Sequence, residues 1–545
     1  MDQKKPHTDW LGMFLAAFVV LACALPQAVL LPALDRDESR FAQASRQMVE
    51  TGDLLDIRFQ EAPRYKKPAG IYWLQTASAT VTGAVDQIWS YRLPSLLGAM
   101  LAAAAVVWGL GGAMPMLTAR LGGILYASSL TLGIEAAIAK TDALLTGLTT
   151  VALMVVLKLF LEGQKPQAAN ETHPRPLAWL SVVFWMALGL AVLVKGPVAP
   201  LLAGLMILVL GMVRRWGWAR PLLNLWGIGL FGLLVVPWAV AITHITDGMF
   251  WQLSVGGDLA PKLAGGHERH GGPFGLHTAL LPFGLWPASV LLPAAVYAGW
   301  VYRRQPVVMA LLAMSLPGLL VFELMPTKLA HYALPTYAGV VGLGLMGAMP
   351  LGRWRRVLGA LVVMLGAVAL AAVMIVVPQL YSGDPMAGWL FAGFVLVGGA
   401  WGAWAVFRNG FAGSVMMLTA AGFVAHLSLT VVAVGAQDLW VAKRVKEALV
   451  MSGWQGETVA SSGFSEPSLV FGLGTETQLV ETPGEVCGAP YGVLDAKALP
   501  ILEGLCPWRP VLTTIWGYNY SKGDPVVLAI IGPEDKQPET DHAQD

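Results

Sequence analysis

Apolar stretches of about 20 residues recur along this chain from Leu11 to Val434, and they constrain its fold more than any other feature. Each stretch is long enough to cross a hydrocarbon core about 30 Å thick as a helix. Hydrophobic residues make up 56% of the sequence and charged residues only 13%, which excludes a soluble globular chain and a disordered one. The sequence therefore predicts an α-helical polytopic membrane protein.

The apolar runs predict about 13 transmembrane helices. The predicted spans are 11–31, 92–113, 119–137, 143–161, 177–194, 197–213, 222–243, 278–300, 306–325, 332–350, 357–378, 387–407 and 412–434. The first span follows Lys4 and Lys5, but it is too long for the apolar core of a signal peptide and lacks a small-x-small cleavage site. We therefore expect it to be a retained anchor.

Basic residues divide the predicted connections into two sets. One set carries Lys4, Lys5, Arg120, Lys165, Arg175, Arg214, Arg215, Arg220, Arg303, Arg304, Arg353, Arg355, Arg356 and Arg408. By the positive-inside rule this set is cytoplasmic, and with it the N-terminus. The opposite, periplasmic set holds two long connections, 32–91 and 244–277. Residues 1–436 are thus predicted to form the transmembrane domain, and 437–545 a C-terminal periplasmic domain.

The C-terminal segment has short β-branched runs separated by Gly and Pro turns, which predicts a small α/β domain of about 100 residues. Cys487 and Cys506 both lie in it, and outside the cytoplasm a disulfide between them is one alternative. The formal net charge is +1, with basic residues spread among short loops, so the basic face typical of nucleic-acid binding is missing. No convincing internal repeat supports a secondary transporter.

Charged residues gather at the outer ends of the predicted spans. They are Asp35, Arg36, Asp37, Glu38, Arg40, Lys140, Asp142, Lys195, Glu323 and Lys328. A charge near membrane depth is costly, so one shared polar site near the external face is the economical explanation. Structural explanations also stay open: Lys195 in a tight turn, Lys328 and His331 reaching water from the interface, and Asp37 at a helix start.

One external loop, LAPKLAGGHERHGGPFGLH, is a candidate metal site. It brings His267, Glu268, His270 and His277 close together in the sequence. No pair has the i, i+4 spacing on a secure helix that makes zinc binding specific, and the flanking glycines favour a loop. No cofactor is therefore certain, and a divalent metal remains an open alternative.

Several motifs, taken in order along the whole chain, resemble one known family. They are DRDESRFAQASRQMVETGD, RYKKPAGIYW, AKTDALL, LVKGPVAP, HERHGGPFG, PTKLAHYALPTY, GFSEPSLVFGLGT and GYNYSKG. The chain resembles the GT-C-fold membrane glycosyltransferases that use polyprenyl-phosphate sugars, the protein O-mannosyltransferase superfamily. Within it, the chain resembles the bacterial branch that contains lipid A aminoarabinose transferase. Each motif is weak alone, whereas their order is specific.

The resemblance implies that Asp37, in the DE-x-R pattern with Glu38, is the catalytic or essential carboxylate. It places Arg40 close to the donor phosphate and makes Asp142 the second acidic position. Lys67 matches the basic residue that holds the carrier phosphate in the aminoarabinose transferases.

The sequence departs from the family pattern at Lys66, where the family typically has a Glu that can ligate a metal. His270 matches the companion histidine and lacks its carboxylate partner, which weakens the metal inference and makes the site more basic. The remaining candidates are Lys195 and Lys328 as phosphate-binding cations, and Tyr65, His331 and Tyr332 as neighbouring site residues.

The chemistry of sugar transfer fits these residue types independently. Breaking the bond between C1 and the phosphate oxygen places negative charge on the departing phosphate, which preorganised Lys and Arg side chains would stabilise. A carboxylate near the acceptor can deprotonate or orient a hydroxyl. With an ionised phosphate as acceptor, no general base is required, and Asp37 would position groups and balance charge.

The sequence thus predicts an inverting glycosyltransferase of the bacterial inner membrane, surrounded by membrane lipids. It would move one sugar from undecaprenyl phosphate to lipid A or another glycolipid on the periplasmic side. Two alternatives stay open: protein O-mannosyltransferase-like transfer to Ser or Thr, and a lipid-linked sugar transporter or flippase. A transporter predicts charged or broken helices near the bilayer midplane, whereas the charges lie at the outer ends. The sugar, the acceptor and the oligomeric state are not determined by the sequence.

Overall fold

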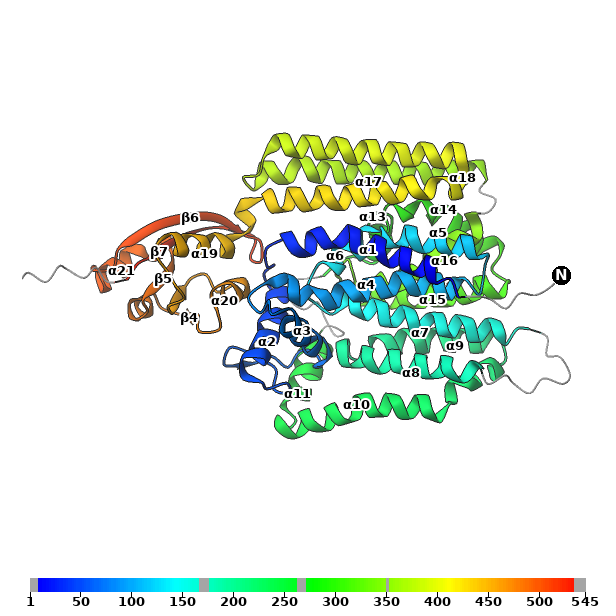
Figure 1. Cartoon of the computed structure of the whole chain (residues 1–545), viewed down its shortest axis with the longest axis horizontal. Helices are drawn as coiled ribbons and strands as arrows, with labels where there is room; N and C mark the ends of the chain where they lie inside the picture. Colours follow the sequence, from blue (N-terminus) through cyan, green and yellow to red (C-terminus); the bar gives the residue numbers. More distant parts are fainter. Residues whose placement is uncertain (1–7, 166–175, 262–270, 349–351, 534–545) are drawn as a thin grey trace, which may run out of the picture.

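A computed structural model describes residues 8–165, 176–261, 271–348 and 352–533 of the chain. A long helical bundle carries a small sheet-containing unit at one end (Figure 1). The helices of the bundle and its loops are α1 (Trp10–Leu30), α2 (Asp37–Thr51), α3 (Gly70–Thr82), α4 (Ile88–Leu110), α5 (Met116–Ala127), α6 (Leu130–Ala136), α7 (Asp142–Glu162), α8 (Pro176–Lys195), α9 (Val198–Val213), α10 (Leu225–Ile245), α11 (Met249–Trp251), α13 (Leu276–Gly284), α14 (Leu292–Val301), α15 (Pro306–Leu324), α16 (Tyr337–Ala348), α17 (Arg353–Leu380) and α18 (Pro385–Gly435).

Eight of the described helices are long and apolar enough to cross a membrane, or up to ten if each of two bent pairs is one span. The chain is therefore a multi-pass membrane protein, as predicted, although the predicted number of about 13 spans is not confirmed. Two predicted spans fall on the bent pairs, α5 with α6 at 60° and Leu276–Gly284 with Ala288–Val301 at 115°. Two others fall on the shorter apolar helices α9 and α16.

Helix α18 contains two of the predicted spans in one assigned element of 51 residues. A straight helix of that length would extend about 76 Å, more than twice the hydrocarbon thickness. Gly410 breaks the helix with φ 70° and ψ −168°, a conformation that glycine reaches at little cost. The two halves then pack against each other, since a Cβ at Gly402 would come within 2.8 Å of Leu418. Together with α17 they lie side by side at the top of Figure 1.

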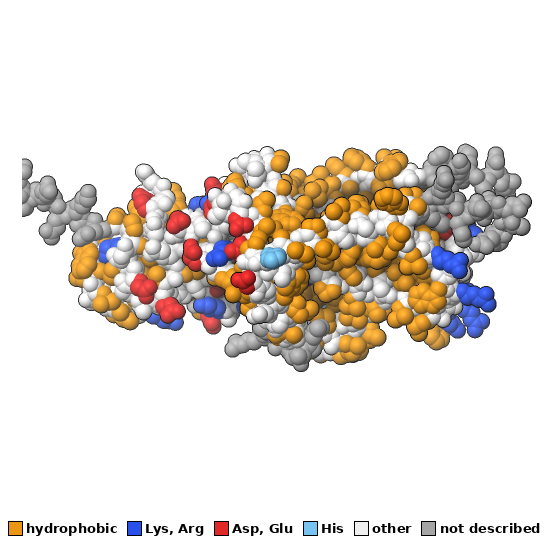
Figure 2. All heavy atoms as spheres, turned by 90° about the horizontal axis from the view of Figure 1, so that it is seen from below, with side chains coloured by type: hydrophobic (Ala, Val, Ile, Leu, Met, Phe, Trp, Pro, Cys, Tyr) orange, Lys and Arg blue, Asp and Glu red, His pale blue; other side chains and the backbone are white. Residues whose placement is uncertain are grey.

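The middle of the molecule has an apolar outer surface. Figure 2 shows hydrophobic side chains covering the bundle, with Lys and Arg at one end and acidic side chains on the sheet-containing unit at the other. Large apolar side chains such as Phe14, Leu233, Trp300 and Leu365 are exposed on the bundle. A surface of this kind is suited to lipid, because the helices satisfy their backbone hydrogen bonds internally.

Helices α2 and α3 lie at the end of the bundle that carries the sheet-containing unit (Figure 1). A short antiparallel pair, β1 (Arg58–Phe59) with β2 (Ala62–Pro63), stands between them. Helix α2 buries one face that includes Phe41, Ala44 and Met48 against the rest of the protein. The connection between α1 and α4 is thus a folded structure that lies against one end of the bundle.

The sheet-containing unit, residues 441–531, is called the C-terminal unit below, and it is built on a five-stranded mixed sheet in the order β4-β3-β5-β7-β6. Its elements are α19 (Val441–Met451), β3 (Val459–Ser462), α20 (Pro467–Leu473), β4 (Gln478–Val480), β5 (Tyr491–Asp495), α21 (Leu499–Leu505), β6 (Val511–Asn519) and β7 (Asp524–Ile531). Strand β3 pairs in parallel with β4 and β5, and β7 pairs antiparallel with β5 and β6. Successive residues Ile530 and Ile531 enter different cores, so both faces of β7 are buried. A disulfide joins Cys487 to Cys506.

Candidate functional site

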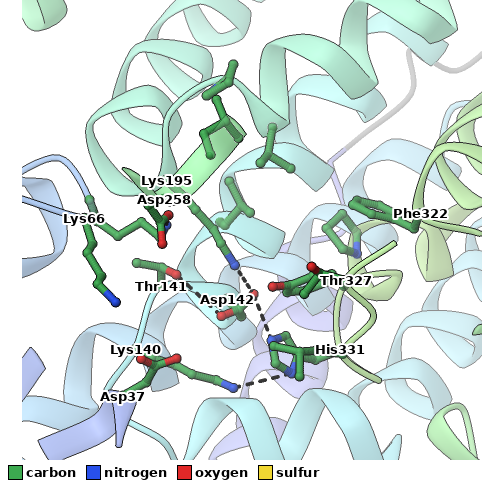
Figure 3. Close-up of a pocket in the computed structure, with 18 of the residues that line it drawn as sticks. Asp37, Lys66, Lys140, Thr141, Asp142, Lys195, Asp258, Phe322, Thr327 and His331 are labelled. Atoms are coloured by element: carbon green, nitrogen blue, oxygen red, sulfur yellow. Dashed lines mark hydrogen bonds and ion pairs between the residues drawn. The ribbon is translucent and has the colours of Figure 1, made fainter. Parts of the chain in front are cut away.

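A cavity of about 310 Å³ lies where α2 and its following loop meet the ends of several bundle helices (Figure 3). Its polar lining consists of Asp37, Arg64, Lys66, Lys67, Lys140, Thr141, Asp142, Thr146, Lys195, Asp258, Thr327, His331 and Tyr332. Its apolar lining includes Phe41, Leu145, Val198, Leu201, Val321, Phe322 and Met325. The cavity therefore joins a densely charged region to an apolar wall.

Helix ends position three of its charged side chains. Asp37 is the first residue of α2 and Asp142 the first residue of α7, whereas Lys195 is the last residue of α8. The helix dipole favours anions at helix starts and cations at helix ends. The three helices thus present charges of the sign that each terminus stabilises.

The Asp142 carboxylate is already engaged by basic side chains. The Lys195 ammonium lies 2.5 Å from Asp142 Oδ1, and His331 Nε2 lies 3.5 Å from the same oxygen. The other ring nitrogen of His331 is 3.3 Å from Glu135, whose second oxygen is 3.0 Å from Lys140. Burial lowers the pKa of His331, and the positive charges of Lys140 and Lys195 act in the same direction. Asp142 is therefore the centre of a fixed network, not a carboxylate with open coordination.

Asp37 differs from Asp142, because within the described parts of the chain no hydrogen bond or ion pair joins its side-chain carboxylate to another residue. Its side chain is exposed to the cavity. Burial within the protein raises its pKa, but the charges of Arg64, Lys140, Arg40 and Lys67 together outweigh burial and hold the pKa below its usual value. Asp37 is thus an ionised carboxylate whose oxygens are available to a bound molecule.

Lys67 forms an ion pair that the sequence did not suggest. Its Nζ lies 2.6 Å from Asp258 Oδ2, and the Asp258 side chain is buried. Asp258 belongs to a short π-helical segment, Gln252–Leu259, more than 190 positions away along the chain. Such segments occur frequently at functional sites, but the sequence signal here is only one acid in a mostly apolar stretch.

The structure brings seven of the predicted site residues to the cavity, namely Asp37, Lys66, Lys67, Asp142, Lys195, His331 and Tyr332. It adds Arg64 and Asp258, which the sequence analysis did not name, and Lys140, which the analysis counted among the charges at the ends of the spans without a role in the site. Arg64 and Lys140 stand inside the RYKKP and AKTD motifs, so their positions in those motifs were the available signal.

Glu38 and Arg40 do not line the cavity. The Glu38 carboxylate accepts hydrogen bonds from Arg92 and from the backbone N–H groups of Leu34 and Ala139. The positive charge of Arg40 helps to lower the pKa of Asp37, which does line the cavity.

Lys328 and Tyr65 also lie off the cavity lining. Lys328 donates to the Met325 carbonyl at 2.6 Å, and the Tyr65 hydroxyl donates to Asp56 at 2.5 Å. His270 lies outside the described residues, as do His267 and Glu268.

One described group of side chains could offer ligands to a metal ion: Glu135, Asp142 and His331, with donor atoms within 4.8 Å of one another. Two ammonium groups, those of Lys140 and Lys195, contact its carboxylates at 3.0 and 2.5 Å. They supply the positive charge that a divalent ion would bring, and an ion would have to displace them. The donor set therefore fits lysine pairing better than a resident metal.

Comparison with known proteins gives both sequence relatives and structural relatives. Residues 10–251 match the family described as dolichyl-phosphate-mannose-protein mannosyltransferase. An undecaprenyl phosphate-alpha-4-amino-4-deoxy-L-arabinose arabinosyl transferase of Pectobacterium atrosepticum is 28% identical over 369 residues, which cover 64% of this chain and 62% of that protein. The protein of the same name from Pseudomonas aeruginosa strain UCBPP-PA14 is 29% identical, with 67% of this chain and 66% of that protein covered. The chain thus matches less than two thirds of the length of each of these relatives.

Two solved structures have a similar fold. The crystal structure of ArnT from Cupriavidus metallidurans bound to undecaprenyl phosphate superimposes with a TM-score of 0.74 at 19% identity, over 96% of this chain and 98% of that chain. The Archaeoglobus fulgidus oligosaccharyltransferase gives a TM-score of 0.51 at 12% identity, over 90% and 69% of the two chains.

Proposed function

We propose that this chain, which is similar to the aminoarabinose transferases in sequence and in fold, is an inverting glycosyltransferase. In this proposal it moves one sugar from undecaprenyl phosphate to lipid A or another glycolipid. The relatives' names refer to this carrier, and the sequence motifs predicted the same class. The observation that carries the proposal is the two-sided lining of the cavity.

The charged side of the cavity suits a sugar phosphate. Arg64, Lys66, Lys67 and Lys140 provide cations around one space, and such groups stabilise an anion that develops as a bond breaks. The apolar side suits the lipid tail, because Val198 and Leu201 of α9 and Val321 of α15 stand on helices of the bundle. A polyprenyl chain could therefore stay in the bilayer while its head group enters the cavity.

In the proposed reaction, the acceptor oxygen bonds to C1 of the sugar as the bond from C1 to the phosphate oxygen breaks. The electron pair of that bond goes to the phosphate, which leaves as undecaprenyl phosphate held by the cations. Asp37 faces the acceptor, where it removes a proton from a hydroxyl or orients an acceptor that is already ionised. Asp142 keeps Lys195 and His331 in place. A single displacement of this kind inverts the configuration at C1.

We infer the orientation of the protein in the membrane from its charges. Helix α9 begins and helix α15 ends at the cavity, so Arg214 and Arg215 after α9, and Arg303 and Arg304 before α15, lie at the opposite end of the bundle. Figure 2 shows Lys and Arg side chains gathered at that end, and by the positive-inside rule we assign it to the cytoplasmic side. The cavity and the C-terminal unit then lie on the periplasmic side of the inner membrane. We divide the chain accordingly into a transferase domain, 1–436, and a periplasmic domain, 437–545.

The test is mass spectrometry of lipid A and total glycolipids from cells with and without the protein, together with in vitro transfer from a labelled undecaprenyl phosphate sugar. We expect one glycolipid to lose a single saccharide when the protein is missing. Label found on Ser or Thr side chains of a protein would show that the acceptor is a protein and not a glycolipid. Movement of the donor across the membrane without transfer would instead support a flippase.

A further inference from the structure

The turn before helix α2 is held by residues from the other end of the sequence. The Asp35 backbone N–H donates to the Tyr520 hydroxyl at 2.6 Å, and the Ser468 hydroxyl donates to the Asp35 carboxylate. The Arg36 guanidinium donates to the backbone carbonyl of Ser521. Three contacts of the C-terminal unit therefore converge on two consecutive residues of the N-terminal loop.

Arg36 has a backbone conformation that requires such support. Its φ is 62° and its ψ is −114°, a region that glycine favours and that costs energy for a residue with a Cβ. A conformation of this kind persists only where the surrounding structure determines it. Asp37 follows directly as the first residue of α2, so the turn at Arg36 sets the direction in which the Asp37 side chain leaves the backbone.

The supporting residues are themselves fixed within the C-terminal unit. Ser468 is buried in α20, and Ser521 is buried in the turn between β6 and β7. The side chain of Asn519 donates to Glu466 at 2.9 Å and accepts from the Ser521 N–H at 3.0 Å. This network connects α20 to the turn after β6, so the groups that contact Asp35 and Arg36 are held together.

The same unit also follows the length of α2. Gln43 donates to the Thr475 hydroxyl at 2.7 Å, and Arg46 donates to the Phe471 carbonyl at 3.2 Å. The docking is therefore an extended contact along the helix that begins at Asp37, with the strained turn at one end of it.

We infer that Ser468 and Tyr520 are positioning residues of the site, which hold the Asp35–Arg36 turn so that the Asp37 carboxylate points into the cavity. Neither residue lines the cavity, so they act through Asp37. The inference rests on the proposed function, in which Asp37 faces the acceptor. It makes the C-terminal unit a structural part of the active site.

The first test compares Tyr520→Phe with Tyr518→Phe in the full-length protein. Tyr518 lies two residues earlier, near the end of β6, and its hydroxyl donates to the Gly523 carbonyl within the unit, at 2.8 Å. We expect Tyr520→Phe to lower kcat about tenfold with an unchanged KM for the donor, because a small misplacement of a reacting group costs rate more than binding. Ser468→Ala should behave in the same way and Ser468→Thr should restore kcat, whereas Tyr518→Phe should match the wild type. Equal kcat values for Tyr520→Phe and Tyr518→Phe would overturn the inference.

The second test does not depend on sugar transfer. In an Asp37→Cys protein, the rate of modification by a charged, water-soluble thiol reagent reports how residue 37 is presented to the cavity. The native Cys23 is buried, and the other two cysteines form a disulfide. We expect Tyr520→Phe to change this rate several-fold and Tyr518→Phe to leave it unchanged. An unchanged rate in both would refute the positioning role, whereas a wild-type protein without transferase activity would refute the proposed function alone.

Discussion

Glu38 and Arg92 form a fully buried, two-pronged ion pair between the start of α2 and α4. Arg92 Nε and Nη2 each lie 2.8 Å from one oxygen of Glu38, and the two side chains are 0% and 1% exposed. Arg92 also donates to the carbonyls of Ala28, Leu31 and Pro32. The pair therefore ties the end of the first membrane helix to the helix that carries Asp37.

Replacement of Arg92 by Leu should destabilise the protein strongly. It would leave the Glu38 carboxylate buried without its partner, which costs about 3–5 kcal/mol. The measurement is thermal unfolding of the purified protein in detergent. Glu447→Ala is the matched control, because its pair with Lys443 is exposed, and exposed pairs contribute about 0–1 kcal/mol. Similar unfolding temperatures for the two variants would contradict a structural role for the buried pair.

Asp37→Asn should abolish most sugar transfer while the fold and donor binding remain. Loss of a positioned carboxylate typically costs a factor of about 100 or more in rate. Donor binding should be unchanged or tighter, because the substitution removes a negative charge near the phosphate. Transfer assays and undecaprenyl phosphate binding give the two readouts, with the exposed Asp86→Asn as control. Full transfer by Asp37→Asn would exclude a catalytic role.

Lys67→Met should weaken binding of undecaprenyl phosphate about tenfold or more, because a hydrogen bond to a charged group contributes about 1.5–3 kcal/mol. Asp258→Asn is the informative partner variant. It keeps the Lys67 ammonium but removes the carboxylate that lies 2.6 Å from it. Binding to Asp258→Asn should be as tight as to the wild type or tighter. Equal weakening by both variants would mean that the pair is needed only for structure.

The stability of the folded protein should depend on pH through Asp35. Burial raises the pKa of Asp35 to about 7, Ser468 acts against this through its hydrogen bond, and Glu466 adds to it through its charge. Arg36 and Tyr520 are the other ionisable groups that face it. The pKa of Asp35 in the folded protein exceeds the value of about 3.9 in the unfolded chain. Protonated Asp35 therefore stabilises the folded state fully below about pH 3.9, and this contribution is lost as the pH rises through about 7.

Thermal unfolding of the wild type should therefore shift to lower temperature between about pH 4 and pH 7 by more than that of Asp35→Asn. The substitution keeps the size of the side chain and removes its titration. An identical pH dependence in both proteins would show that Asp35 does not contribute.

The membrane fold could be predicted from the sequence because each apolar run has to span the bilayer or be buried. The bends could be read only in part. The break at Gly410 lies between the predicted spans 387–407 and 412–434, beside Arg408, whereas the break between α5 and α6 at Ser128 and Ser129 falls inside one predicted span, 119–137. Hydropathy measures how apolar a segment is, and it contains no information on the direction of the backbone.

Much of the candidate site could also be predicted, because charged side chains at the ends of apolar spans are costly to expose to lipid and are expected to face a shared cavity or a charged partner. Asp37, Asp142 and Lys195 meet at one cavity as expected. Asp258 and Glu135 were missed because their importance comes from distant partners, Lys67 and His331, that only the folded chain brings near.

The hydrogen bond between Asp35 and Tyr520 joins two parts of the chain that are 485 positions apart. The turn at Arg36 cannot reach its final surroundings until the ribosome has synthesised the chain beyond Ser521. A product that stops before Ser468 would still contain α1 to α18 and would insert in the bilayer, but its Asp35–Arg36 turn would lack the contacts that hold it. Premature termination would then yield a protein that is inserted in the membrane but inactive. Sugar transfer would begin only after the C-terminal unit has been synthesised and has folded.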